Sequence, residues 1–188
     1  MTPIHEKVLK AARRVFAAHG YNDTSMLAIA EQARIAVGGL YKFYPSKLEL
    51  FQAVYQLENQ ASKERIVTRI DWSRPKEAIH AYVQATVRAV RRSKILGEWY
   101  SDIPGEILRQ TYREELKKSP KQGCVILGDF FAERIAEWRT AGLLRAEATD
   151  RIIGEWFIAV ASVDATADIS PKTMQFMIAA MVDALFVE

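Results

Sequence analysis

Apolar residues recur along this chain with the three- and four-residue spacing of α-helices, and no stretch shows the alternation that predicts a β-strand. The first apolar stripe lies between Thr2, which can cap a helix start, and Gly20, which can end one. Pro3 suits the first helical position, where an N–H has no intrahelical partner. The stripe consists of Ile4, Val8, Leu9, Ala12, Val15 and Phe16. The sequence therefore predicts a helix at the N-terminus.

Glycine and proline separate later segments that keep the same helical period. They predict helices over about 75–94 and 106–118, one that ends at Gly142, and two more over about 148–163 and 170–187. No hairpin signal lies between them, so the whole chain is predicted to be all-α.

Residues 24–51 predict two short helices, a turn between them and the start of a longer third helix that runs toward Arg69. Thr24 or Ser25 can cap the first short helix. The second places Leu40 and Phe43 on its inner face. Its outer face is free to meet a partner and carries Val37, Gly38, Tyr41 and Lys42. Two short helices braced by a longer one form a helix-turn-helix.

The segment AIAEQARIAVGGLYKFYPSKLEL, at residues 28–50, resembles the DNA-binding segment of the tetracycline-repressor (TetR) family of transcription regulators. The likeness is carried by Ile-Ala at 29–30, Leu-Tyr at 40–41, Phe-Tyr at 43–44 and Ser-Lys at 46–47, and it is strong over about 8–51. Downstream it extends only to the general layout of helices. It implies an N-terminal DNA-binding domain over 1–50 and a helical ligand-binding and dimerisation domain over 51–188.

The resemblance implies two sets of contacts with double-stranded DNA. The expected phosphate contacts, which position a protein without reading sequence, are Thr24, Ser25, Tyr44 and Lys47. The residues expected to face the major groove are Val37, Gly38, Gly39, Tyr41 and Lys42, with Arg34 at the edge. Among these, Lys42 can reach guanine acceptors and Val37 a thymine methyl group.

The recognition helix departs from the family pattern at its start. Ala36 stands where many relatives have Ser or Thr, and Gly38 and Gly39 occupy positions that can hold base-reading side chains. Each glycine costs about 1 kcal/mol of helix stability relative to alanine. We expect this helix to be weakly formed in the free protein, to let backbone approach the groove closely and to read few bases through side chains.

The basic excess of the chain lies in its first 50 residues. They hold seven Lys or Arg against four Asp or Glu, while residues 51–188 hold 19 against 19, so the net charge of +3 belongs to the first segment. Phosphate neutralisation supplies most nonspecific affinity for DNA, so this placement fits a DNA-binding segment. Chance surface charge is the alternative, because three charges are few.

Other function classes find little support in the composition. No apolar run approaches the roughly 20 residues needed to cross a membrane, and the N-terminus has no secretion signal, so we expect a cytoplasmic protein without a membrane partner. The single cysteine, Cys124, allows no intrachain disulfide, and the three scattered histidines show no metal-ligand spacing. No nucleophile-and-base pair is evident, so neither an enzyme nor a cofactor is expected.

The larger segment is rich in aromatic residues, and the resemblance implies that it holds a small-molecule effector. The candidate ligand-binding residues are Tyr82, Trp99, Tyr100, Phe130, Phe131 and Trp138. Aromatic residues at helical spacing also form ordinary cores, which is the alternative for each of them.

The last two predicted helices are apolar on more than one side, which calls for a second partner. By resemblance, two such helices from each subunit form a four-helix bundle in a homodimer. The expected interface residues are Ile153, Trp156, Phe157, Val160, Met177, Ala180, Met181 and Ala184. Burial inside a monomer is the alternative.

Together these observations predict a ligand-responsive regulator of transcription. We expect a repressor that binds a near-palindromic operator as a homodimer and is released by a small-molecule effector. An effector-independent DNA-binding or architectural protein is the first alternative. An all-α enzyme with a structural helix-turn-helix is the second, and it lacks residues to carry its chemistry.

Overall fold

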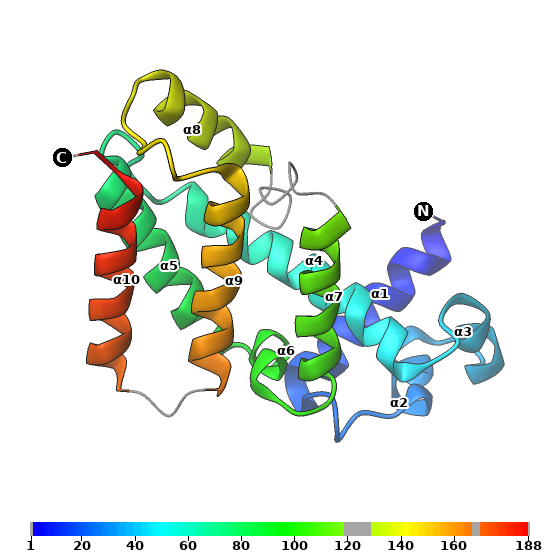
Figure 1. Cartoon of the computed structure of the whole chain (residues 1–188). Coiled ribbons are helices and arrows are strands. Elements are labelled where there is room, and N and C mark those ends of the chain that lie inside the picture. Colours follow the sequence, from blue (N-terminus) through cyan, green and yellow to red (C-terminus); the bar gives the residue numbers. More distant parts are fainter. Residues whose placement is uncertain (1, 119–128, 167–169, 188) are drawn as a thin grey trace. The chain divides into compact units, whose positions relative to one another are not determined.

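The computed structural model describes residues 2–118, 129–166 and 170–187, and every regular element in them is a helix (Figure 1). This confirms the predicted all-α class. The elements are α1 (Pro3–His19), α2 (Met26–Ala33), α3 (Val37–Phe43), α4 (Lys47–Val67), α5 (Pro75–Arg92), α6 (Lys94–Gly97), the 3-10 helix η1 (Glu98–Tyr100), α7 (Gly105–Lys118), α8 (Asp129–Thr140), α9 (Asp150–Thr166) and α10 (Pro171–Leu185). None of the described helices is long and apolar enough to span a bilayer.

The helix ends follow the residues that predicted them. The Thr2 hydroxyl accepts a hydrogen bond from the His5 N–H at the start of α1, and Gly20 ends that helix with a φ of 78°. Ser25 caps α2 by accepting from the Ala28 N–H at 3.1 Å. Such caps satisfy N–H groups that have no partner within the helix.

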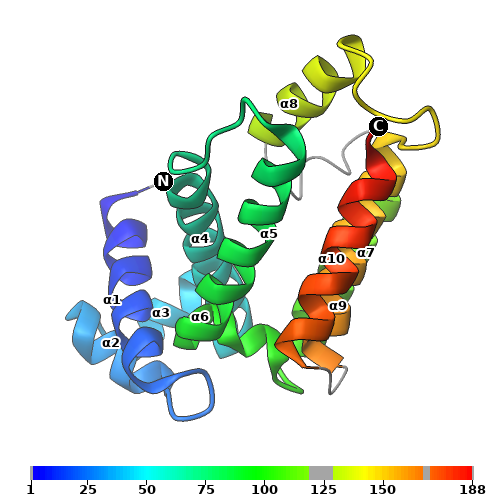
Figure 2. The same cartoon turned by 90° about the vertical axis from the view of Figure 1, so that its left-hand side faces the viewer.

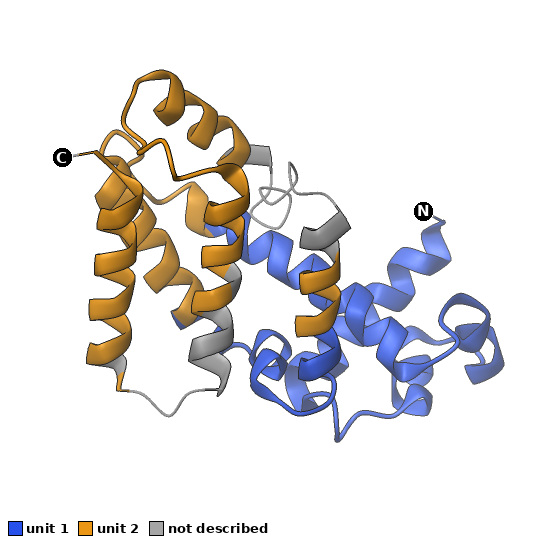
Figure 3. Cartoon of the chain, in the orientation of Figure 1, with its two compact units in different colours: residues 1–65, 88–108 blue, residues 66–87, 109–188 orange. Residues whose placement is uncertain are grey.

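The chain divides into two compact units (Figure 3). Residues 1–65 and 88–108 form unit 1, and residues 66–87 and 109–188 form unit 2. The divisions fall inside α4, α5 and α7. Unit 1 thus contains the predicted helix-turn-helix together with a later segment. The predicted domain boundary near residue 50 stays a prediction.

Unit 1 is built around apolar residues of α1 to α4. Phe16 of α1 and Phe51 of α4 are fully buried, and their rings meet edge to face with centroids 5.0 Å apart. Ile29 of α2 and Leu40 of α3 are equally buried. Edge-to-face pairs add to the free energy of burial, so this core fixes both short helices on their longer neighbours.

A buried carboxylate also ties α1 to α4 inside unit 1. Glu58 accepts a hydrogen bond from Arg13 Nε at 2.6 Å, and Arg65 lies 3.6 Å from its other oxygen. Glu58 is only 9% exposed, so its charge is stabilised by these two guanidinium groups. The same hydrogen bond raises the pKa of Arg13.

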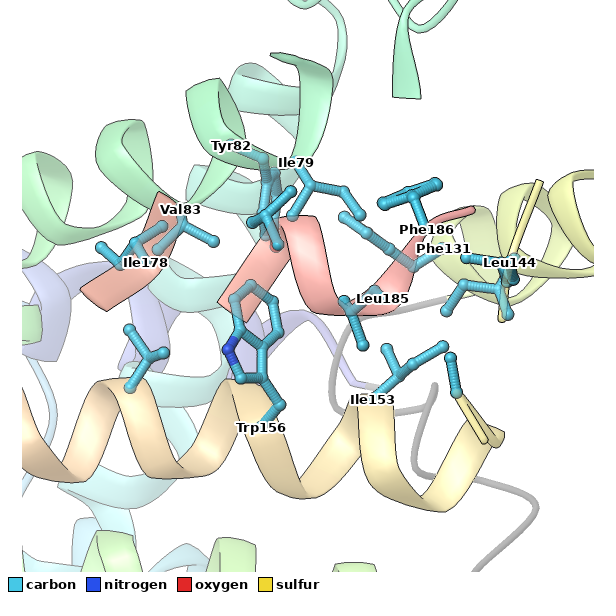
Figure 4. Close-up of a cluster of buried hydrophobic side chains, with 14 of the residues drawn as sticks. Ile79, Tyr82, Val83, Phe131, Leu144, Ile153, Trp156, Ile178, Leu185 and Phe186 are labelled. Atoms are coloured by element: carbon cyan, nitrogen blue, oxygen red, sulfur yellow. The ribbon is translucent and has the colours of Figure 1, made fainter. Parts of the chain in front are cut away.

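Unit 2 has its own aromatic and aliphatic core. Figure 4 shows side chains of α5, α9 and α10 pointing toward one another, among them Tyr82, Trp156 and Ile178. In both overall views, α9 and α10 run side by side (Figures 1 and 2). At the end of the chain, the Val187 N–H donates to the Leu143 carbonyl at 2.9 Å. This contact fixes the end of α10 to the segment before α9.

Candidate nucleic-acid interface

The outer face of α3 is exposed, as predicted. Tyr41 is 48% exposed and Val37 is 37% exposed, and Lys42 also points to solvent. Leu40, on the opposite face, is completely buried and anchors the helix in unit 1. One side of α3 therefore holds the fold while the other side is free for a ligand.

Nothing inside the chain requires glycine at positions 38 and 39. Both residues lie within α3, and a Cβ added to either would meet no atom within 4 Å. The helix also starts without a side-chain cap, because Ala36 has no hydroxyl to accept a hydrogen bond. The two glycines thus weaken α3 without serving its packing.

The end of α3 rests on a histidine that the sequence analysis did not single out. His5 Nε2 lies 2.6 Å from the Tyr44 hydroxyl, and the His5 ring stacks on Phe43 with centroids 5.9 Å apart. Phe43 is 38% exposed, so the prediction that it points into the core is wrong. In this short helix, the last turn covers the N-terminal turn of α1 instead. Partial burial raises the pKa of Tyr44, whose phenol stays neutral.

Thr24 and Ser25, both predicted to contact phosphates, have different surroundings at the start of α2. The Thr24 hydroxyl donates to the Gly20 carbonyl at 2.7 Å, and the residue is 4% exposed. Ser25 is exposed at the helix start, next to N–H groups that suit a phosphate oxygen. Thr24 therefore holds the preceding loop, while the Ser25 side chain is exposed to solvent.

Lys47 is occupied within the chain. Its ammonium group donates to the backbone carbonyls of Tyr21 at 2.9 Å and Thr24 at 3.0 Å, with Asn22 at 3.4 Å. It also lies 4.3 Å from the centre of the Tyr21 ring. These contacts fix the loop between α1 and α2 onto the start of α4. The N–H groups at the start of α4 still suit a phosphate.

Arg34 sits in the turn between α2 and α3. It ends α2 in the left-handed conformation, with a φ of 52°, and its N–H donates to the carbonyls of Ala30 and Glu31. Its side chain is exposed. The predicted DNA-binding residues that are accessible in unit 1 are thus Ser25, Arg34, Val37, Gly38, Tyr41 and Lys42, with Gly39, Tyr44 and Lys47 partly covered.

The predicted effector-binding residues divide between the two units. Tyr82, Phe131 and Trp138 lie in the core of unit 2, where the Tyr82 and Phe131 ring centroids are 4.6 Å apart. Trp99 and Tyr100 belong to unit 1, where Trp99 stacks on Tyr55. The side chain of Phe130 lies outside the described part of the chain.

Three buried polar atoms of unit 2 have no hydrogen-bond partner in the described structure. They are the Tyr82 hydroxyl, the Thr86 hydroxyl and the Trp156 indole nitrogen. Burial raises the pKa of Tyr82 to about 12 against the opposing effect of the nearby Thr86 hydroxyl, which lies outside hydrogen-bond geometry, so the phenol remains protonated and able to donate. Thr86, one helical turn from Tyr82, was missed by the sequence analysis, although that spacing could have revealed it. Within the described ranges, no group of three or more metal-binding side chains is found.

The predicted dimer residues divide between the core and the surface of unit 2. Ile153, Trp156 and Val160 are buried in the core of unit 2, which favours the alternative of burial within one chain for these three residues, and their place in an interface stays a prediction. They are buried because they pack on α5 and α10. Phe157, Met177 and Met181 are half-buried, while Ala180 and Ala184 are exposed. Phe176, at 76% exposure, is the most exposed large apolar residue of α10.

Sequence comparison finds relatives of the N-terminal region. Residues 8–54 match the profile described as bacterial regulatory proteins, tetR family. The HTH-type transcriptional regulator UidR of Escherichia coli K12 is 37% identical over 78 residues, which are 42% of this chain and 37% of UidR. The HTH-type transcriptional repressor KstR of Mycolicibacterium smegmatis is 31% identical over 98 residues, 50% of this chain and 46% of KstR. The chain spans less than half of the length of these relatives.

Comparison of structures extends the likeness to the fold of the whole chain. RolR, solved in complex with resorcinol, is similar with a TM-score of 0.63 at 17% identity, over 98% of this chain and 88% of RolR. This likeness confirms a fold with an N-terminal helix-turn-helix followed by a larger helical region.

Proposed function

We propose that this chain is a DNA-binding regulator of transcription whose N-terminal region, over residues 8–54, is of the tetR family of bacterial regulatory proteins. The observation that carries this proposal is the exposed outer face of α3, fixed from behind by the buried Leu40. A surface helix with one anchored face is the geometry that enters a major groove. The proposed role is regulatory, acts on DNA in the cytoplasm and includes no catalytic step.

In the proposed complex, Tyr41, Val37 and Lys42 face the base edges. Lys42 donates to guanine acceptors and Val37 contacts a thymine methyl group. Ser25, Tyr44 and the N–H groups at the start of α4 bind phosphates, which fixes the orientation of α3. The absence of side chains at Gly38 and Gly39 allows the backbone to approach the groove.

We propose a homodimer that pairs through the exposed side of α9 and α10. Phe176, Ala180 and Ala184 recur at four-residue spacing on α10 and are all exposed, and Ile152 of α9 is exposed as well. Small residues next to a large apolar one let two helices approach closely and still bury apolar area. A two-fold dimer would present two recognition helices about 34 Å apart, one turn of DNA.

We propose that unit 2 takes a small-molecule effector and that its binding releases DNA. The supporting observation is the aromatic cluster that contains Tyr82 and Trp156, whose hydroxyl and indole nitrogen are buried without partners. RolR, with a similar fold, was solved with the aromatic diol resorcinol. Effector and DNA must favour different states, with a coupling of about 1–3 kcal/mol. KstR is a repressor, and we propose the same sign of regulation here.

Selection of bound duplexes from a random pool tests the central proposal. The expected result is a two-fold symmetric site whose binding weakens steeply as salt rises, because phosphate contacts release counterions. Salt-sensitive binding without an enriched sequence would favour an effector-independent architectural protein instead. No binding to any duplex would overturn the proposal. The selected duplex then serves as the probe in a screen for effectors that release it.

A further inference from the structure

The seven basic residues of the first 50 positions do not share one role. Arg13 pairs with Glu58, Lys47 binds the carbonyls of the 20–25 loop, and Lys42 lies on the outer face of α3. The other four line a single surface hollow of about 440 Å³ between α1 and the end of α2. The full lining is Lys7, Lys10, Ala11, Arg14, Glu31, Gln32 and Arg34.

Helical spacing explains why three of these cations converge. Lys7, Lys10 and Arg14 are separated by three and four residues, so they share one face of α1. Ala11 lies between them, is buried and leaves room for the hollow. Arg34 enters from the turn after α2.

The charge of the hollow is not balanced within the described chain. Four cations face a single carboxylate, that of Glu31, and none of the four forms an ion pair with a described residue. Elsewhere in the described chain, Arg13, Arg139 and Arg151 each have a carboxylate within 2.8 Å. Repulsion among like charges at this spacing disfavours the empty hollow, so an anion would stabilise it.

From these observations we infer that the hollow is a second phosphate-binding surface, which extends the DNA contact from α2 and α3 to α1. The inference rests on the proposed DNA-binding function. The position of Arg34 favours DNA as the source of phosphate, because this residue lines the hollow and also lies in the turn that leads into α3. Arg34 therefore links the hollow to the turn beside α3, where a DNA backbone would pass. Lys and Arg without base contacts set affinity and register, not sequence.

Two charge-matched triple variants test the inference. The hollow variant carries Lys7→Gln, Lys10→Gln and Arg14→Gln. The control removes three cations that lie outside the hollow, with Arg69→Gln, Lys76→Gln and Arg92→Gln. Circular dichroism first establishes that both variants fold. The salt dependence of binding is then measured on the selected duplex, with and without about ten flanking base pairs at each end.

The hollow variant is expected to lose salt dependence. Each lost phosphate contact lowers the slope of log affinity against log salt by about 0.9, so the slope should fall by about 2–3 per subunit. The control should keep the wild-type slope. Trimming the flanks should lower the wild-type slope while leaving that of the hollow variant unchanged. Equal slopes for the two variants on the long duplex would overturn the inference.

A calorimetric titration with tripolyphosphate separates DNA from free phosphate as the source. We expect no saturable binding to the wild-type protein. Saturable binding that the hollow variant alone loses, with an unchanged DNA slope, would mean that the hollow takes a free phosphorylated molecule, and would overturn the DNA assignment. Failure of the proposed function is distinct from both results, because the wild-type protein would then select no duplex.

Discussion

Single residues in unit 1 are divided between holding the fold and facing outward, and the two roles are rarely shared. Leu40 is buried while its neighbour Tyr41 is half exposed. Thr24 is hydrogen-bonded inward while Ser25 is exposed at a helix start. Substitutions at outward positions should therefore change binding without changing stability. Gly38 is a special case, because its substitution should raise stability and weaken DNA binding.

Gly38→Ala should stabilise the free protein and weaken its binding to DNA. Alanine is favoured over glycine in a helix by about 1 kcal/mol, and its Cβ meets nothing within the chain. The same methyl group would stand between the α3 backbone and the groove. Denaturant unfolding and titration with the selected duplex measure the two effects. Unchanged or tighter binding would disprove the close approach of the backbone.

Tyr82→Phe should leave the stability of the protein unchanged or raise it by up to about 1 kcal/mol. Its hydroxyl is buried without a partner, so removing it ends a desolvation penalty while the ring packing remains. Phe131→Ala, in contact with the same ring, is the comparison and should cost about 3–5 kcal/mol. Chemical denaturation gives both values. A loss above about 1 kcal/mol for Tyr82→Phe would mean that the hydroxyl is bonded.

At the residue scale, sequence reasoning succeeded where local spacing determines the outcome. The inward Leu40 and the outward Tyr41 followed from helical period alone. The bond between His5 and Tyr44 could not be predicted, because it joins residues 39 positions apart and depends on how α1 and α3 pack. The three carbonyls that bind Lys47 were missed for the same reason.

Among the elements, helix bounds were the most predictable feature. α1 begins one residue after Thr2, and α2 begins one residue after Ser25, which with Thr24 was one of its two candidate caps. Which face of α9 lies inside could not be predicted, because this helix is apolar on more than one side. In the structure, the face of α9 that carries Ile153 and Trp156 lies in the core.

The link between α4 and the loop before α2 depends on one ammonium group. Lys47→Met keeps the length of the side chain but leaves up to three carbonyls without a donor. We expect a loss of about 1–3 kcal/mol in unfolding free energy, with weaker DNA binding as α2 shifts. Lys42→Met removes the same charge from an exposed site, so it should weaken DNA binding and leave stability within about 0.5 kcal/mol. Equal stability of both variants would contradict this role for Lys47.

For the whole molecule, the proposed function requires two copies, because one α3 reads only half of a two-fold site. Each chain divides its apolar residues of unit 2 between the buried core and an exposed row on α10. The sequence showed that α9 and α10 carry more apolar surface than one side needs. Only the fold shows which residues remain outside.

Phe176→Glu should therefore separate the dimer without unfolding the chain. The side chain is 76% exposed in the single chain, so a carboxylate there remains solvated, whereas in the proposed interface it would be buried without a partner. Leu57→Glu, at a site 51% exposed on α4, is the matched control and should stay dimeric. Sedimentation equilibrium at micromolar concentration should show a monomer only for Phe176→Glu, with helical content retained. That monomer should bind the selected duplex far more weakly, since the two half-sites are no longer joined in one binding event. A dimeric Phe176→Glu protein would place the interface on another face of the chain.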